Sequence, residues 1–120
     1  MPPLTPQAVK YVLMAQDMDR AVAFYRDTMG FTENFTSPYW SELRFGTAIL
    51  GLHGGGDGQR QPTGLSLQYE NVAAAYQTAL QAGAQAIHPP EQREGEPIIL
   101  ATIQDPEGNG IMLTQYLGHE

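Results

Sequence analysis

Apolar residues recur at helical spacing in a stretch near the start of the chain. The positions are Met18, Ala21, Val22, Tyr25 and Met29. They fall at i, i+3, i+4, i+7 and i+11, which predicts an amphipathic helix over about 18–29. Asp17 precedes the stripe as a predicted N-cap, and Gly30 follows where a left-handed C-cap would lie.

A second helical pattern begins about 54 residues later, after Asn71 as the predicted N-cap. Its apolar positions are Val72, Ala75, Tyr76, Ala79 and Leu80. Gly83 follows the pattern and predicts its end. The chain therefore carries two capped helices of similar character, one in each half.

Short apolar or alternating runs bounded by turn residues predict the strands. The runs are 8–15, 31–36, 39–45, 48–53, 64–69, 84–88, 97–103 and 110–117. We expect the run 84–88 to stop at Pro89. The sequence Gly46-Thr47 predicts a hairpin, and Asp105-Pro-Glu-Gly-Asn109 predicts a tight turn in which Gly108 and Asn109 take positive φ.

The order β-α-β-β-β therefore occurs twice. This repeat predicts an α+β fold of two βαβββ units with pseudo-twofold symmetry. We expect one domain over 1–120, with units at about 8–53 and 63–117 and a Gly-rich linker over 54–62. Each helix would cover one face of a curled mixed sheet, and the opposite faces would form a cup for a ligand. The linker lacks the Gly-Lys-Ser/Thr ending of a phosphate-binding loop, and no helix follows it.

Composition narrows the choice of partners. The chain has 120 residues, 42% hydrophobic and 16% charged, with no apolar run long enough to span a membrane. The absence of cysteine and of a signal-peptide pattern fits a cytoplasmic location. The net charge is −7, and the six basic residues are scattered, which disfavours nucleic acid. A neutral or cationic small molecule fits this charge, although acidity alone also keeps a protein soluble.

Three motifs carry a family resemblance. The segment 17–31, the segments Trp40-Ser-Glu-Leu-Arg-Phe-Gly and Leu50-Gly-Leu-His53, and the turn 105–109 occur in the order seen in the vicinal oxygen chelate superfamily. The chain resembles that superfamily, which includes glyoxalase I, extradiol dioxygenases and bleomycin resistance proteins. The resemblance implies the same two-unit fold and a homodimer. It leaves the chemistry open, because one fold hosts many functions.

Enzymes of the superfamily hold a divalent metal with four residues on four strands. The matching positions here are Lys10, Gly51 (or Leu50), Gly64 and Met112. A protonated Lys repels a metal ion, Gly and Leu have no donor atom, and a Met thioether suits Cu(I) rather than harder ions. Shifting the match by one residue brings in no His or carboxylate. We therefore expect neither a metal ion nor another cofactor.

Other residues are candidates for direct ligand contact. His53 shares the face of Gly51 and is either a polar contact or base, or a strand-end residue that meets solvent. Trp40 and Tyr39 would stack on a planar ligand, or Trp40 would lie in a dimer interface. Lys10 would neutralise an acidic ligand or extend to the rim. His88 and His119 are expected to have no functional role.

A mixed, uncharged lining is expected on the second unit, where Ser66 and Gln68 share the face of Gly64, and Thr114 and Tyr116 that of Met112. The complete predicted ligand-binding set is Lys10, Tyr39, Trp40, Glu42, His53, Ser66, Gln68, Met112 and Thr114. No catalytic residue is predicted.

The leading hypothesis is a metal-free protein that binds a small organic molecule and sequesters a drug or metabolite, as in the antibiotic-resistance branch of the superfamily. One alternative is a lyase, isomerase or dioxygenase with an atypical divalent-metal site that involves His53. Another is an interaction domain that uses the sheet cleft for a partner protein. Elemental analysis separates the first two, because a metal-dependent enzyme would carry a bound ion.

Overall fold

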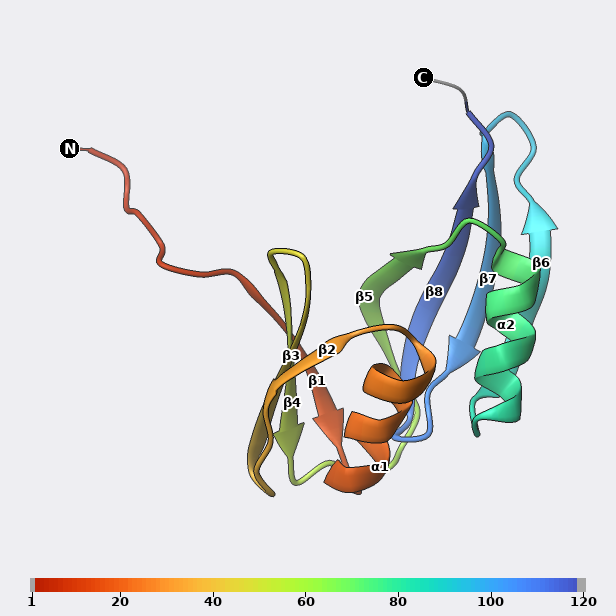
Figure 1. Cartoon of the computed structure of the whole chain (residues 1–120). Helices are drawn as coiled ribbons and strands as arrows, with labels where there is room; N and C mark the ends of the chain where they lie inside the picture. Colours follow the sequence, from red (N-terminus) through yellow and green to blue (C-terminus); the bar gives the residue numbers. More distant parts are fainter. Residues whose placement is uncertain (1, 119–120) are drawn as a thin grey trace.

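Two four-stranded mixed sheets form the molecule (Figure 1). The structure, a computed structural model, describes residues 2–118. The first sheet has the order β1 (Lys10–Ala15), β4 (Ala48–Gly54), β3 (Trp40–Phe45) and β2 (Thr32–Phe35). The second has the order β5 (Gln61–Gln68), β8 (Asn109–Tyr116), β7 (Ile98–Gln104) and β6 (Gln85–Gln92). In each sheet the first pair is parallel and the other pairs are antiparallel, which confirms the predicted repeat of a βαβββ unit.

The two predicted helices form where the caps place them. Helix α1 spans Met18–Ala23 and α2 spans Val72–Gln81. Asp17 and Asn71 each accept a backbone N–H of the first turn through a side-chain oxygen, at 3.2 and 3.0 Å. Gly30 has φ +99° and ends the first helical segment in the left-handed region. No helix within residues 2–118 is long and apolar enough to cross a membrane.

The first helix ends differently from the prediction. After Ala23 it widens into a π-helical turn, η1 (Phe24–Thr28), in which the backbone N–H of Met29 donates to the carbonyl of Phe24 at 3.0 Å. Phe24 and Tyr25, which begin this turn, are both buried, at 3% and 0% exposure, although the predicted apolar stripe includes only Tyr25.

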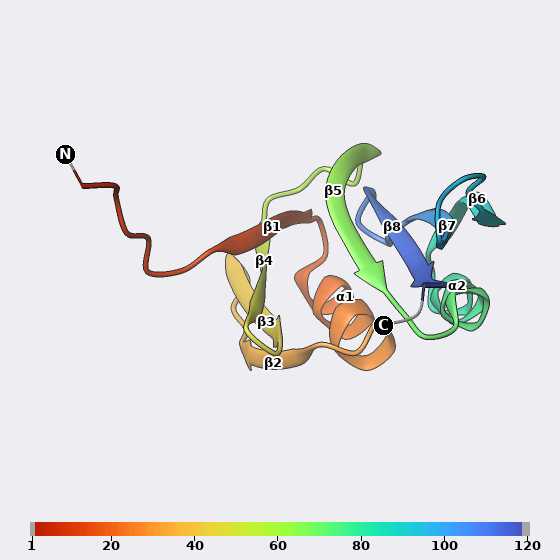
Figure 2. The ribbon, with the colours of Figure 1, turned by 90° about the horizontal axis from the view of Figure 1, so that it is seen from above.

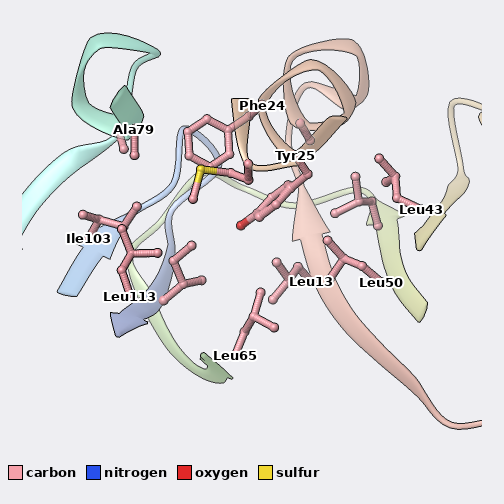
Figure 3. Packing of buried hydrophobic residues seen from close by; sticks show 14 of the residues in the cluster. Leu13, Phe24, Tyr25, Leu43, Leu50, Leu65, Ala79, Ile103 and Leu113 are labelled. Carbon is pink, nitrogen blue, oxygen red and sulfur yellow. The ribbon is translucent and has the colours of Figure 1, made fainter. Parts of the chain in front are cut away.

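Both units share one hydrophobic core, because α1 lies between the two sheets (Figure 2). Phe24 and Tyr25 meet edge to face, with ring centroids 5.0 Å apart. Figure 3 shows these rings between leucines of the first sheet and apolar residues of the second. Helix α2 covers the second sheet beside them.

The turn 105–109 ties the second unit to the first helix. The Tyr25 hydroxyl donates to Asp105 at 2.5 Å. Glu107 accepts the backbone N–H groups of Gln16 and Asp17, at 2.9 and 2.7 Å, and the Nε–H of Arg20 at 2.6 Å. Burial raises the pKa of Asp105, against the lowering effect of its hydrogen bonds, the first of which comes from Tyr25. The turn 105–109 therefore holds the two units together.

Two local predictions are wrong. Strand β6 continues through Pro89 and Pro90 instead of stopping at His88. Strand β6 lies at the edge of the sheet and pairs only with β7, and its register with β7 shifts between His88 and Glu91. An edge strand tolerates proline because the missing backbone N–H is not needed for pairing on its open side. Asn109 has no positive φ, since none of the non-glycine residues described has one. It starts β8, and its side-chain amide donates to the carbonyl of Met14 at 2.8 Å.

The segment 2–9 extends away from β1 and is exposed along its length (Figure 1). Two large hydrophobic side chains of this segment, those of Leu4 and Val9, are exposed to solvent.

Candidate functional site

Four predicted ligand-binding residues meet on the face of the first sheet opposite α1. Lys10 projects from β1, Trp40 and Glu42 from β3, and His53 from β4. They share a face because the pairing sets Trp40 beside His53 and Glu42 beside Gly51, while side chains alternate along each strand. We call these four residues the Trp40 cluster.

An ion pair lies at the centre of the Trp40 cluster. The Lys10 ammonium is 2.9 Å from Glu42 Oε2, and the Trp40 Nε1–H donates to the same oxygen at 2.9 Å. Hydrogen bonding from Lys10, and next from Trp40, lowers the pKa of Glu42. The Glu42 side chain is 11% exposed and that of Lys10 40%, so the carboxylate is held inside while the ammonium reaches solvent.

His53 lies at the edge of this cluster. Its ring is edge-to-face with the indole, with centroids 6.3 Å apart. Nδ1 donates to the carbonyl oxygen of Gly54 at 2.6 Å, an arrangement that leaves the lone pair of the neutral ring on Nε2. Tyr39 precedes the cluster and is 81% exposed, so its ring reaches outward rather than into the group.

Aromatic side chains lie against two of the four positions that the family resemblance matches to metal ligands. A Cβ on Gly51 would meet the six-membered ring of Trp40, with Cζ2 only 2.6 Å away. A Cβ on Gly64 would lie 2.8 Å from the hydroxyl of Tyr11. Real Cβ atoms almost never come this close to another heavy atom. Glycine at these two positions therefore leaves space that the Trp40 indole and the Tyr11 hydroxyl fill.

The residues present do not fit a divalent metal ion. At the other two positions, Lys10 is in an ion pair and Met112 offers only a soft thioether. Within residues 2–118, no three His, Asp or Glu side chains lie close enough to share an ion.

The remaining predicted residues form a second group on the other sheet. Ser66 pairs with Met112, and Gln68 pairs with Thr114, across the parallel β5 and β8. Because α1 lies between the two sheets, the faces that it leaves open point in different directions (Figure 2). Within one chain, the predicted ligand-binding residues therefore lie in two separate groups, one on each sheet. His88 is exposed on the edge strand β6, and His119 lies outside the described residues.

One feature that the sequence did not predict is a pocket of about 650 Å³ on the α1 side of the sheets. It is lined by Tyr11, Phe31, Phe45 and residues of β5 that include Ser66 and Gln68. Aromatic residues at strand ends were its only sequence signal, and these are common at surfaces.

Residues 10–114 of the chain match the model of a protein family whose description is "Glyoxalase-like domain". No curated protein matches the chain. Among solved structures, a glyoxalase/bleomycin resistance protein/dioxygenase family enzyme from Burkholderia phytofirmans PsJN is 21% identical, with a TM-score of 0.76 over 90% of this chain and 97% of that one.

A second similar structure is the bleomycin-binding protein of bleomycin-producing Streptomyces verticillus, complexed with copper(II)-bleomycin. It is 18% identical, with a TM-score of 0.68 over 98% of this chain and 100% of that one. At such identities the two structures establish a common fold. The family match over residues 10–114, which is most of the chain, shows that this protein belongs to the family of Glyoxalase-like domains.

Proposed function

We propose that this protein binds a small planar organic molecule without a metal ion, at the Trp40 cluster. The observation that carries the proposal is the indole of Trp40 over Gly51, which fills the space of a metal ligand and is held by Glu42. An aromatic surface thus replaces the donor atoms on which the enzymes of the superfamily rely.

The chemistry of the cluster favours stacking. Trp40 is partly exposed, and its hydrogen bond to Glu42 fixes the plane of the ring. Lys10 and Glu42 neutralise each other at short range, whereas the net charge of −7 attracts cations from a distance. A planar ligand that carries a positive charge is attracted both by the face of the Trp40 ring and by the negative field of the protein.

We further propose that a second copy completes the site. The second group is uncharged and lies on the other sheet, where Ser66 and Gln68 of β5 pair with Met112 and Thr114 of β8. Ser66 and Gln68 also line the pocket described above. A homodimer that sets the second group of one copy over the Trp40 cluster of the other would enclose a ligand between mixed walls. Sequestration of a drug in the cytoplasm, as in resistance to an antibiotic, would follow from such a site.

Titration calorimetry tests the proposal with ethidium, with metal-free bleomycin and with copper(II)-bleomycin. We expect saturable binding of at least one probe, and a loss of about tenfold or more in affinity in Trp40→Ala. Trp40→Phe keeps an aromatic face and should lose less. Val9→Ala, an exposed change outside the cluster, should bind as the wild type does.

The proposal fails if none of the probes binds or if Trp40→Ala binds as tightly as the wild type. Sedimentation velocity tests the dimer. A ligand-saturated protein that sediments as a single chain would contradict a site shared between copies.

The alternative enzyme would use a metal ion bound near His53. Elemental analysis of protein purified without chelator distinguishes it. One tightly bound Fe, Mn, Ni or Zn per chain, lost in His53→Ala, would favour the enzyme and contradict the metal-free site.

A further inference from the structure

The pocket on the α1 side of the sheets is separate from the Trp40 cluster. We call it the inter-sheet pocket, and the residues used below are Tyr11, Phe31, Phe45, Leu50, Leu65 and Tyr69. Leu50 and Gly51 are neighbours on β4, so they project from opposite faces of the strand. Leu50 lines the inter-sheet pocket, whereas Gly51 lies under Trp40. A molecule in one site therefore does not touch the other.

The inter-sheet pocket reaches the hydrophobic core. Its floor includes Leu50 and Leu65, which are 1% and 9% exposed and belong to different sheets. Figure 3 shows these two side chains extending from their strands towards the same interior. The space is thus a cleft between the units rather than a flat surface, and its volume of about 650 Å³ lies in the range of small-molecule sites.

Aromatic side chains from separate elements form the walls. Tyr11 comes from β1, Phe31 follows the π-helical turn, Phe45 ends β3, and Tyr69 follows β5. The Tyr69 hydroxyl donates to the carbonyl of Met29 at 2.8 Å, so this wall is fixed. Phe45 is 71% exposed at the mouth, where its ring would gain contact area from a bound molecule.

Charge selects the kind of ligand. Among residues 2–118, none of the lysines, arginines and histidines lines the inter-sheet pocket, and Glu70 is its one carboxylate. Glu70 is exposed, so it lies where it meets solvent rather than the core. An anion would meet no compensating group inside and would be repelled by Glu70 and by the net charge. A cation would lose its hydration without a buried partner.

We propose that the inter-sheet pocket binds an uncharged, aromatic hydrophobic molecule. The apolar body lies on Leu50 and Leu65, its rings stack against Tyr11 and Phe31, and Phe45 covers it. The inter-sheet pocket shares no residue with the Trp40 cluster, whereas Ser66 and Gln68, which belong to the second group of the proposed dimer site, also line it.

Two fluorescent probes with the same ring system test the charge selection. N-phenyl-1-naphthylamine is neutral, and 1-anilinonaphthalene-8-sulfonate adds one negative charge. We expect the neutral probe to bind with enhanced emission, about tenfold or more tightly than the sulfonate. Glu70→Lys should narrow this difference by strengthening sulfonate binding and leaving the neutral probe unchanged.

Variants of the walls locate the probe. Phe45→Ser removes a wall and Ala48→Trp fills the mouth; both side chains are exposed, so the fold should persist, as circular dichroism will check. We expect each to weaken N-phenyl-1-naphthylamine binding by about tenfold. The matched control is Phe35→Ser, which removes an exposed phenylalanine that does not line the pocket.

Four results would overturn the proposal. The first three are no binding of the neutral probe, equal binding by Ala48→Trp and the wild type, and competition between the neutral probe and ethidium, which would assign the probe to the Trp40 cluster. A fourth is sedimentation as a dimer in the wild type that Phe45→Ser abolishes, because a second copy would then occupy the pocket.

Discussion

The substitution Gly51→Ala tests whether Trp40 occupies the place of the metal ligand. The added methyl group would overlap the indole, with Trp40 Cζ2 at 2.6 Å and Cζ3 at 3.1 Å. Strand β4 is paired on both sides, to β1 and β3, so its backbone cannot easily shift. We therefore expect the indole to swing away.

Two costs follow when the indole moves. The hydrogen bond from Trp40 Nε1 to the Glu42 carboxylate is lost, and bonds to charged groups are worth about 1.5–3 kcal/mol, less when partly exposed. Residual crowding adds a typical overpacking cost of about 1 kcal/mol. We expect the free energy of unfolding to fall by about 2 kcal/mol, which for a chain of this size corresponds to about 8 °C in Tm.

Urea unfolding followed by circular dichroism measures this loss, and the emission of Trp40, the sole tryptophan, reports the movement by a shift to longer wavelength. In Trp40→Ala/Gly51→Ala the methyl group meets no ring, so the double variant should lose about 1–2 kcal/mol less than the sum of the single variants. The control is Gly110→Ala, a strand glycine whose Cβ would meet neighbours at an ordinary 3.4 Å. Wild-type stability and emission in Gly51→Ala would refute the reasoning.

Three further predictions concern stability. Glu107→Gln should lower the free energy of unfolding by about 3 kcal/mol in urea titrations, because the fully buried Glu107 carboxylate accepts hydrogen bonds from two backbone N–H groups and from the Arg20 guanidinium. The control, Glu94→Gln at an exposed position, should have little effect, and an equal effect of both changes would contradict a stabilising role of these hydrogen bonds. Hydrogen bonding lowers the pKa of Glu42, so the ionised Glu42 side chain stabilises the folded protein above its ordinary pKa, and this stabilisation is lost as the pH falls through the lowered pKa. The stability difference between the wild type and Glu42→Gln should therefore shrink below about pH 4, and a difference that stays constant would contradict the prediction. Burial raises the pKa of Tyr69 to about 12, so the neutral Tyr69 side chain stabilises the folded protein below its ordinary pKa of 10, and this stabilisation is lost as the pH rises through 12. The wild type should lose stability relative to Tyr69→Phe over this pH range, and parallel plots of stability against pH would contradict the prediction.

Local sequence was enough to predict the fold. Asp17, Asn71 and the glycines at 30 and 83 mark the ends of the helices, since capping needs only residues within one turn. The wrong predictions concern features that depend on neighbouring strands. Strand β6 passes through two prolines because it lies at an edge, and no pattern along the chain states which strand is an edge.

The candidate site was only partly predictable. Alternation along β3 and β4 places Trp40, Glu42 and His53 on one face, because the side-chain period of a strand is fixed. The ion pair of Lys10 with Glu42 joins residues 32 positions apart, and their contact depends on how β1 and β3 flank β4. Nothing in the sequence pattern predicts that pairing of side chains.

The amino-acid sequence predicted the repeat and the helix caps, and its motifs indicated the family and predicted that the matching positions lack metal donors. All of these predictions depend on residue type and short-range spacing. The three-dimensional arrangement established that the Trp40 ring covers Gly51 and the Tyr11 hydroxyl lies against Gly64, that the predicted site residues divide between two sheets, and that a pocket opens on the α1 side. These features depend on packing between distant segments, where shape and volume decide which side chains meet.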